Sequence, residues 1–217
     1  MSATQYLQSL AAEDCRAAAH GVFTDALVGG TRSQEKMLGY QQQDYLFVEG
    51  LVRFFASAVA NASTLAGSVP ATHFSGLICS PKNTNFLRSS EALEVKSTVE
   101  LAPQTHAFQA QMDYARHSGR YEMMPSILMI AVGIYLGWTV PFEDYQDDLP
   151  FWFCDWIIPH MGEGFKQVVA YFICQFDIIW ETLNKTAGGE VSAICMRGGC
   201  LERALFDASW AGFTVAK

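Results

Sequence analysis

Hydrophobic and polar positions follow helical spacing over most of this chain. The clearest case runs from Ser33 to Ala60, where Thr31 and Gln34 have the spacing of a capping box after the Gly29-Gly30 break. The apolar residues there recur every three, four or seven positions, as one face of a helix requires. They are Met37, Tyr40, Phe47, Val48, Leu51 and Phe55. The pattern predicts one long amphipathic helix.

The other apolar segments repeat this periodicity and are separated by Gly, Pro and polar residues. We expect one or two helices within 3–28, and further helices over 83–96, 104–117, 124–138, 145–158, 165–183 and 190–213. The stretch 68–80 is ambiguous because prolines and a glycine interrupt it. Two-residue alternation is nearly absent, and no Asn-Gly or Asp-Gly turn joins two apolar runs. The whole chain is therefore predicted to be one all-α domain, a bundle of about eight helices.

Composition narrows the classes of function. The chain has 14 basic and 22 acidic residues, a net charge of −8, and no Lys/Arg cluster, which argues against binding nucleic acid. Its longest apolar stretch, Ile127–Trp138, is shorter than the ~20 residues that span a membrane, so it is interpreted as a buried core helix. The N-terminus lacks the features of a signal peptide, and the six cysteines form no C-x-x-C pair. We expect reduced thiols in a cytoplasmic protein.

Two acidic residues fall on apolar helix faces. Asp44 follows Tyr40 by four positions, and Glu202 precedes Leu205 and Phe206 by three and four. A carboxylate that faces a core needs hydrogen bonds or a cationic partner, or else its pKa rises. Two such groups on separate helices could converge on one cavity, where paired carboxylates suit general acid and base catalysis.

Plainer explanations exist for both carboxylates, because structural ion pairs also place acids on helix faces. Asp44 could cap a neighbouring helix or pair with Arg53 or Arg88. Glu202 could pair with Arg197. Sequence alone leaves these alternatives open.

Metal and cofactor motifs are sparse. Asp113 and His117 have the i,i+4 spacing that could chelate an ion, but a helical metal site needs further ligands, typically E-x-x-H pairs, and the sequence has none. The glycine-rich nucleotide motifs and G-x-S-x-G are also absent. We therefore predict a protein without metal or cofactor. The aromatic segment 151–153 and Trp156 are assigned to packing.

Four short segments occur in a fixed order along the chain: QDYL at 43–46, YLGW at 135–138, Trp156-Ile157, and ERALFD at 202–207 followed by Trp210. In order and spacing they resemble the TenA/THI-4 proteins, a family of haem-oxygenase-like fold whose typical members hydrolyse thiamine or its aminopyrimidine breakdown products. The resemblance implies that Asp44 holds a substrate amine or ring nitrogen. It also implies that Glu202 acts as acid and base, and that both face one pocket inside the bundle.

The chain departs from the family pattern in the expected pocket. Phe47 and Phe108 stand where the family usually has tyrosines, which removes two hydroxyls. The nucleophilic cysteine of the thiaminase branch should lie near Leu136, where there is none, so covalent catalysis by that route is not expected. A further family tyrosine corresponds to His160, which can exchange a proton near neutral pH. His160 could equally cap a helix end.

Three functions fit these residues. The first is a divergent enzyme that uses metal-free hydrolysis, elimination or cyclisation on a small organic substrate less polar than an aminopyrimidine. The second is an aminopyrimidine aminohydrolase of thiamine salvage. The third is a non-catalytic ligand-binding or assembly protein, which a pocket filled by Phe47 and Phe108 would favour. The expected substrate contacts are Tyr40, Phe47, Phe108, Tyr135, Leu136, Trp138 and Leu205. By resemblance the chain should form a homodimer or homotetramer.

Overall fold

The computed structural model describes residues 1–94, 99–120, 123 and 148–213. Over these residues the chain is helical and contains no β-strand, so the all-α prediction is confirmed. The helices are α1 (Ala3–Leu10), α2 (Ala12–Ala19), α3 (Val22–Val28), α4 (Gln34–Asn61), α5 (Leu65–Leu77), α6 (Asn83–Ala92), α7 (Pro103–His117), α9 (Phe151–Met161), α10 (Glu163–Trp180) and α11 (Lys185–Ala211). None of these helices is long and apolar enough to cross a bilayer.

The structure differs from the predicted boundaries in several regions. Helix α9 begins at Phe151 and not at 145, because a turn and a bend at 148–149 precede it, and α11 begins at Lys185 and not at 190. The N-terminal stretch forms three short helices instead of one or two, and α2 gives way to α3 at Gly21. A Cβ on Gly21 would lie 2.5 Å from the Ala17 carbonyl oxygen, so the backbone turns where only glycine fits. The ambiguous stretch is helical throughout, because α5 continues through a π-helical segment, Ile78–Lys82, into α6. The predicted helix 124–138 lies outside the described residues.

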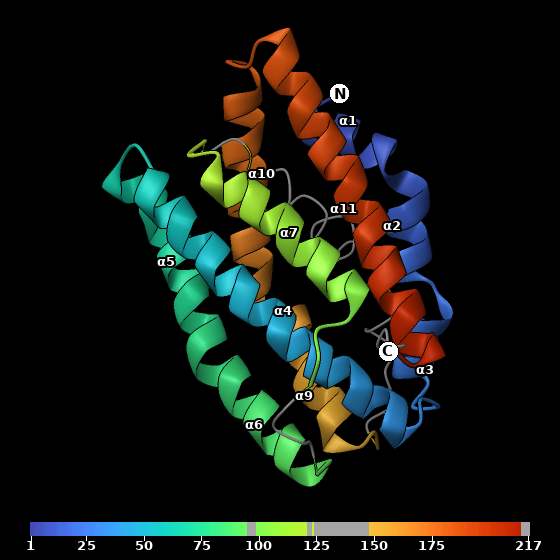
Figure 1. Ribbon diagram of the computed structural model, residues 1–217. Coiled ribbons are helices and arrows are strands. Elements are labelled where there is room, and N and C mark those ends of the chain that lie inside the picture. The colour runs from blue at the N-terminus through green and yellow to red at the C-terminus, as the bar shows by residue number, and fades with distance from the viewer. Residues whose placement is uncertain (95–98, 121–122, 124–147, 214–217) are drawn as a thin grey trace.

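Helix α4 crosses the bundle, and α5 and α7 pack along it (Figure 1). Ser33 caps this helix, and not Thr31 as predicted, because the Ser33 hydroxyl directly precedes the first turn and accepts the Lys36 backbone N–H at 3.3 Å. α7 runs parallel to α4. The Gln43 side chain of α4 meets the start of α7, and the Ser57 hydroxyl donates to the Arg116 carbonyl near its end.

A buried amide fixes the start of α7 against α4. The Gln43 side chain donates to the Glu100 carbonyl and accepts the Ala102 backbone N–H, each at 2.9 Å. Its amide oxygen also accepts the Thr105 hydroxyl at 2.8 Å. These partners lie just before α7 or in its first turn, so the residue next to Asp44 sets the register of the two helices.

Helix α11 runs antiparallel to α4 and α7, and α2 and α3 pack on it (Figure 1). The Gln111 side chain of α7 donates to the Ile194 carbonyl in the first half of α11 at 3.0 Å. Near the other end of α11, Ser209 accepts a hydrogen bond from Arg32, which precedes α4. The second half of α11, which carries Glu202, therefore lies by the first half of α4.

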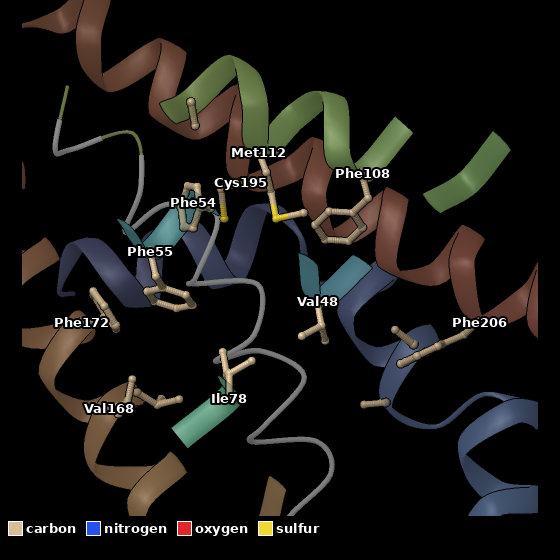
Figure 2. Close-up of a cluster of buried hydrophobic side chains, with 14 of the residues drawn as sticks. Val48, Phe54, Phe55, Ile78, Phe108, Met112, Val168, Phe172, Cys195 and Phe206 are labelled. Atoms are coloured by element: carbon tan, nitrogen blue, oxygen red, sulfur yellow. The ribbon is translucent and has the colours of Figure 1, made fainter. Parts of the chain in front are cut away.

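An apolar core surrounds the second half of α4 (Figure 2). The Phe55 ring lies 4.6 Å from that of Phe74 and 5.8 Å from that of Phe172, measured between centroids. Figure 2 shows Met112 of α7 and Cys195 of α11 turned into the same cluster. Each phenylalanine removed from water contributes ~1.5–3 kcal/mol, so this core holds α4, α7, α10 and α11 together.

Candidate functional site

Tyr40, in the first half of α4, lies at the centre of the candidate site. Its side chain is only 4% exposed, and its hydroxyl oxygen accepts the Trp156 indole N–H at 3.0 Å. The centroid of its ring lies 4.8 Å from that of Phe23, 5.9 Å from that of Trp156 and 6.2 Å from that of Phe206. These neighbours belong to α3, α9 and α11, so four helices meet at one phenol.

Asp44 and Glu202 both act electrostatically on Tyr40. The pKa of Tyr40 is raised well above its usual value, first by burial and then by the charges of Asp44 and Glu202, which disfavour a phenolate. Asp44 lies one turn after Tyr40 and is 5% exposed. Glu202 is half-buried, one turn before Phe206 on α11. The fold therefore brings the two carboxylates from separate helices to the same phenol.

The Tyr40 hydroxyl can act as a hydrogen-bond donor. The Trp156 N–H occupies one lone pair of the oxygen, and the raised pKa keeps the phenol protonated at neutral pH. In the described part of the chain, the Tyr40 proton has no acceptor of its own. The hydroxyl can therefore donate a hydrogen bond to a ligand that binds beside it.

The ion pairs considered as plainer explanations are wrong for the arginines involved. The pairs that form are Arg53 with Glu49 at 3.8 Å, Arg88 with Asp155, and Arg203 with Asp14 at 3.1 Å. Arg197, the partner suggested for Glu202, is exposed. Each of these arginines lies at the surface, where its charge stays hydrated, and this is why none of them reaches the interior carboxylates.

Phe47 and Phe108 pack on each other between α4 and α7. Their rings meet edge to face, with centroids 5.0 Å apart and planes at 80°. Phe108 is buried and Phe47 is half-buried against the core. The predicted contact Leu205 is buried on α11, beside Phe206. The other predicted contacts, Tyr135, Leu136 and Trp138, lie outside the described residues.

His160 lies against Trp156 near the end of α9. The two rings stack at 4.4 Å between centroids, and His160 Nδ1 lies 2.6 Å from the Trp156 carbonyl oxygen. Because a carbonyl oxygen can only accept, Nδ1 carries the proton, and Nε2 of the neutral ring is then the basic nitrogen. The contact lies within α9, one turn back along the helix. His160 is thus joined to Tyr40 through the Trp156 side chain.

Three further residues near Tyr40 or Glu202 were not predicted as site residues. Trp156 had been assigned to packing, and the signal was its place in the family-like segment at 156–157. Cys15 of α2 lies close enough to Glu202 for that charge, after burial, to raise its thiol pKa to about 11. Arg32 is buried with its guanidinium carbon 3.9 Å above the Phe23 ring. Its only sequence signal was a cation directly before a helix cap.

The Asp113 and His117 side chains do not form a metal site together. The Asp113 carboxylate pairs with Arg116 at 2.7 Å, and His117 Nδ1 contacts the Asp113 backbone carbonyl at 2.8 Å. Among the residues that the structure describes, no group of three or more His, Cys, Asp or Glu side chains could hold a metal ion.

A groove of about 490 Å³ lies where α10 turns into α11, away from Tyr40. Arg120 and Glu190, which line it, form an ion pair at 2.5 Å. Glu190 precedes Glu202 by twelve residues on α11, a distance of about 18 Å along a helix. The groove is therefore separate from the candidate site.

A comparison with models of known protein families gives a match that covers most of the chain. The sequence matches the TENA/THI-4/PQQC family over residues 13–208. The chain belongs to this family. The match includes the helices that carry Tyr40, Asp44, Trp156 and Glu202. A search of curated proteins by sequence found no match.

Solved structures of TenA proteins share the fold of this family member. A TenA homologue from P. horikoshii OT3 superposes with a TM-score of 0.84 at 16% identity, over 98% of this chain and all of that one. A TenA homologue from Pyrococcus furiosus gives 0.86 at 14% identity, over 96% of this chain and 100% of that one. A putative TenA-like thiaminase from Sulfolobus solfataricus gives 0.79 at 13% identity, over 98% of both chains. The predicted TenA-like helical bundle is confirmed.

Proposed function

We propose that this chain is a small-molecule enzyme of the TenA type, which acts on a nitrogen-containing substrate by acid and base catalysis with side chains alone. The observation that supports this most directly is the approach of Asp44 and Glu202, from α4 and α11, to the single phenol of Tyr40. Two carboxylates in unlike surroundings, one deeply buried and one half-buried, can take different parts in a proton transfer.

The three polar groups have distinct roles in this proposal. Asp44, which is 5% exposed, binds the substrate amine or ring nitrogen, because a buried carboxylate is stabilised by a cationic or N–H partner. Glu202 is less buried and exchanges a proton with the substrate or with a water molecule. Tyr40 keeps its proton and donates a hydrogen bond from its hydroxyl to the developing negative charge.

In this proposal Phe47 and Phe108 form walls of the site and favour a substrate less polar than an aminopyrimidine. Phe47 and Phe108 offer ring faces and edges where hydroxyls would bind polar groups. A polar substrate group placed against them would lose its hydrogen bonds to water without replacement, which costs a few kcal/mol. Hydrolysis, elimination and cyclisation are all compatible with the two carboxylates.

His160 is the third catalytic candidate. Its ring stacks on that of Trp156, whose indole N–H donates to the Tyr40 hydroxyl, so one side chain separates it from the phenol. We propose that His160 adjusts proton transfer at this site near neutral pH.

Two alternatives remain to be tested beside this proposal. Thiamine salvage as an aminopyrimidine aminohydrolase is supported by the two carboxylates and by the shared fold with a putative TenA-like thiaminase. A non-catalytic binding or assembly role is supported by the edge-to-face contact of Phe47 with Phe108, which occupies space that a ligand would need. The family resemblance implies a dimer or tetramer, and both alternatives are compatible with such an oligomer.

The first experiment offers the protein two pyrimidine substrates. Thiamine and aminomethyl-aminopyrimidine are incubated separately with the wild type, Asp44→Asn and Glu202→Gln, and hydroxymethylpyrimidine is measured by mass spectrometry. Glu49→Gln is the matched control, because Glu49 is an exposed carboxylate on the same helix. Release that only the two site variants abolish establishes the salvage reaction. No release from the folded wild type rules it out.

A second experiment covers the less polar substrates. A panel of heteroaromatic amines, each with its uncharged carbon analogue, is screened for an increase in the Tm of the protein. The proposal expects amines to stabilise the wild type and Glu49→Gln but not Asp44→Asn. If no amine binds, or if amines bind equally well to the wild type and to Asp44→Asn, the proposed enzyme function is wrong and the non-catalytic alternative is favoured.

A further inference from the structure

Arg32 is a buried cation at one edge of the Tyr40 site. It is 4% exposed and directly precedes Ser33, the residue that caps α4. Its Nη2 group donates to the Lys36 carbonyl at 3.0 Å and to the Ser209 hydroxyl. Its guanidinium carbon lies 3.9 Å above the centre of the Phe23 ring and 5.4 Å from that of Tyr40. The aromatic rings thus cover a face of the guanidinium, and its N–H bonds point outward in its plane.

Part of this guanidinium lacks acceptors. The Nε and Nη1 atoms are shielded from solvent and have no hydrogen-bond partner. None of the ion pairs formed within the described ranges involves Arg32, so its charge faces no carboxylate there. Burial lowers the pKa of Arg32 to about 10, which still leaves the group protonated at neutral pH. A buried charge without a counterion is strongly unfavourable, and native structures satisfy such groups almost always.

The end of α11 explains only part of this arrangement. Ser209 lies in the last turn of that helix, where the negative end of the helix dipole attracts cations. Lys36 is held there too, with its ammonium 3.8 Å from the centre of the Trp210 ring. The dipole favours a cation beside Ser209, but it provides no acceptor for Nε or Nη1. A separate acceptor is needed.

The position of Arg32 gives the site two poles. Tyr40 lies between them, one turn before Asp44 on α4 and with its ring centre 5.4 Å from the Arg32 guanidinium carbon. The charge of Asp44 raises the pKa of its phenol and the charge of Arg32 lowers it. Arg32 reaches the level of Lys36, and Asp44 lies eight residues further along α4, or about 12 Å. A negative pole around Asp44 and a positive pole at Arg32 thus flank one phenol.

We propose that Arg32 binds an anionic oxygen group, a carboxylate or a phosphate, at the positive pole of the Tyr40 site. This inference rests on the proposed function for one point only: the anionic group is taken to be part of the substrate whose nitrogen binds Asp44. The substrate class is then a small amino acid-like or phosphorylated amine about as long as the distance between the poles. The N–H bonds of Nε and Nη1 donate to the anionic oxygens, while Nη2 stays on Lys36 and Ser209.

The first test uses free anions and needs no turnover. The Tm of the protein is measured with sodium acetate and with inorganic phosphate, each against sodium chloride at equal ionic strength. We expect a saturable increase for acetate or phosphate in the wild type and in Arg197→Met, an exposed arginine on α11. Arg32→Met should lose this increase and bind the anion about ten- to a hundredfold more weakly, as expected for the loss of a hydrogen bond to a charged group.

Removing the unpaired charge should not by itself unfold the protein, because an apolar side chain of similar length is often tolerated in place of a buried ion. If Arg32→Met nevertheless fails to fold, Arg32→Gln takes its place, since it keeps a donor for Ser209 and removes the charge. An anion effect that survives in the folded variant overturns the proposal. So does the absence of any anion effect in the wild type, which would leave a buried water as the acceptor.

The second test identifies the source of the anionic group. The affinities of a heteroaromatic amine with and without a carboxylate side group are compared in the wild type, Arg32→Met and Asp44→Asn. A carboxylate that tightens binding in the wild type and in Asp44→Asn, but not in Arg32→Met, places the anionic group on the substrate. If free acetate or phosphate binds at Arg32 but no amine binds, the anion site stands and the proposed function fails. If amines bind through Asp44 and the carboxylate makes no difference, the inference about Arg32 fails alone.

Discussion

The two halves of helix α4 bury different kinds of side chain. In the half that precedes Gly50, the buried residues include Tyr40, Gln41, Gln43 and Asp44, whereas in the half that follows it they are Phe54, Phe55 and Ala58. The apolar half is stabilised by the burial of hydrophobic side chains, which does not require a specific partner atom for each of them. Every buried polar group of the other half needs a donor or acceptor at hydrogen-bonding distance, and it costs stability where it lacks one.

The difference shows where this molecule is built for chemistry and where it is built for stability. Gln43 has its partners and fixes α7, but Tyr40 keeps a proton to donate and Arg32 keeps N–H bonds without acceptors. Such groups lower the stability of the ligand-free fold and become favourable when a ligand completes them. Burial of the phenylalanine core at the other end of α4 offsets the loss of stability that these groups cause.

The largest effect is expected for a substitution in the polar half of α4, and it is an effect on activity. Asp44→Asn should lower kcat/KM by about 10²- to 10⁴-fold once a substrate is known, because the amide cannot hold a cationic nitrogen or support the proton transfer. Its free energy of unfolding should change little in comparison. Steady-state kinetics and urea unfolding of the same preparation measure both. An inactive variant that is also grossly unfolded would mean that Asp44 is structural.

In the apolar half the balance reverses. Phe55→Ala should lower the free energy of unfolding by about 3–5 kcal/mol, because it leaves a cavity among Phe54, Phe74 and Phe172. Ligand binding at Tyr40 should persist wherever the variant is folded. Leu65→Ala, at a position that is 83% exposed, is the control and should change stability by less than about 0.5 kcal/mol. A comparable loss in both variants would contradict the assigned core.

The apolar core contains the buried thiol of Cys195, whose ionisation links stability to alkaline pH. Burial raises the pKa of the Cys195 thiol from 9.0 to about 12. Because the folded-state pKa is the higher one, this contribution to stability is complete below pH 9 and is lost as the pH rises toward 12. The loss should be on the order of 2 kcal/mol near pH 11. Urea unfolding at both ends of this range should show a smaller pH dependence for Cys195→Ala than for the wild type.

The smallest expected effect concerns one hydrogen bond at the site. Tyr40→Phe leaves the Trp156 indole N–H without its acceptor and should lower the free energy of unfolding by about 1–2 kcal/mol. Tyr114→Phe, at an exposed position on α7, is the matched control and should be neutral. Equal stabilities of Tyr40→Phe and the wild type would show that water replaces the phenol oxygen.

Helical periodicity predicted most of the fold and the two carboxylates. Asp44 could be found because it interrupts an apolar stripe whose other members are buried or half-buried in the structure. The site role of Trp156 was missed because an aromatic residue in an apolar run has the same pattern whether it packs or donates a hydrogen bond. Of the predicted substrate contacts, Tyr40, Phe47, Phe108 and Leu205 could be placed in the fold, and their contacts with substrate stay predictions.

The sequence by itself determined the helices, the face that each one buries and the membership of the TENA/THI-4/PQQC family. These follow from local spacing, which sets which side chains share a helix face. Only the tertiary structure decided that Arg32 meets Ser209 across 177 positions, and that Asp44 and Glu202 act on one phenol. Contacts between distant helices depend on how whole faces pack, and the spacing within one helix carries no record of its partner.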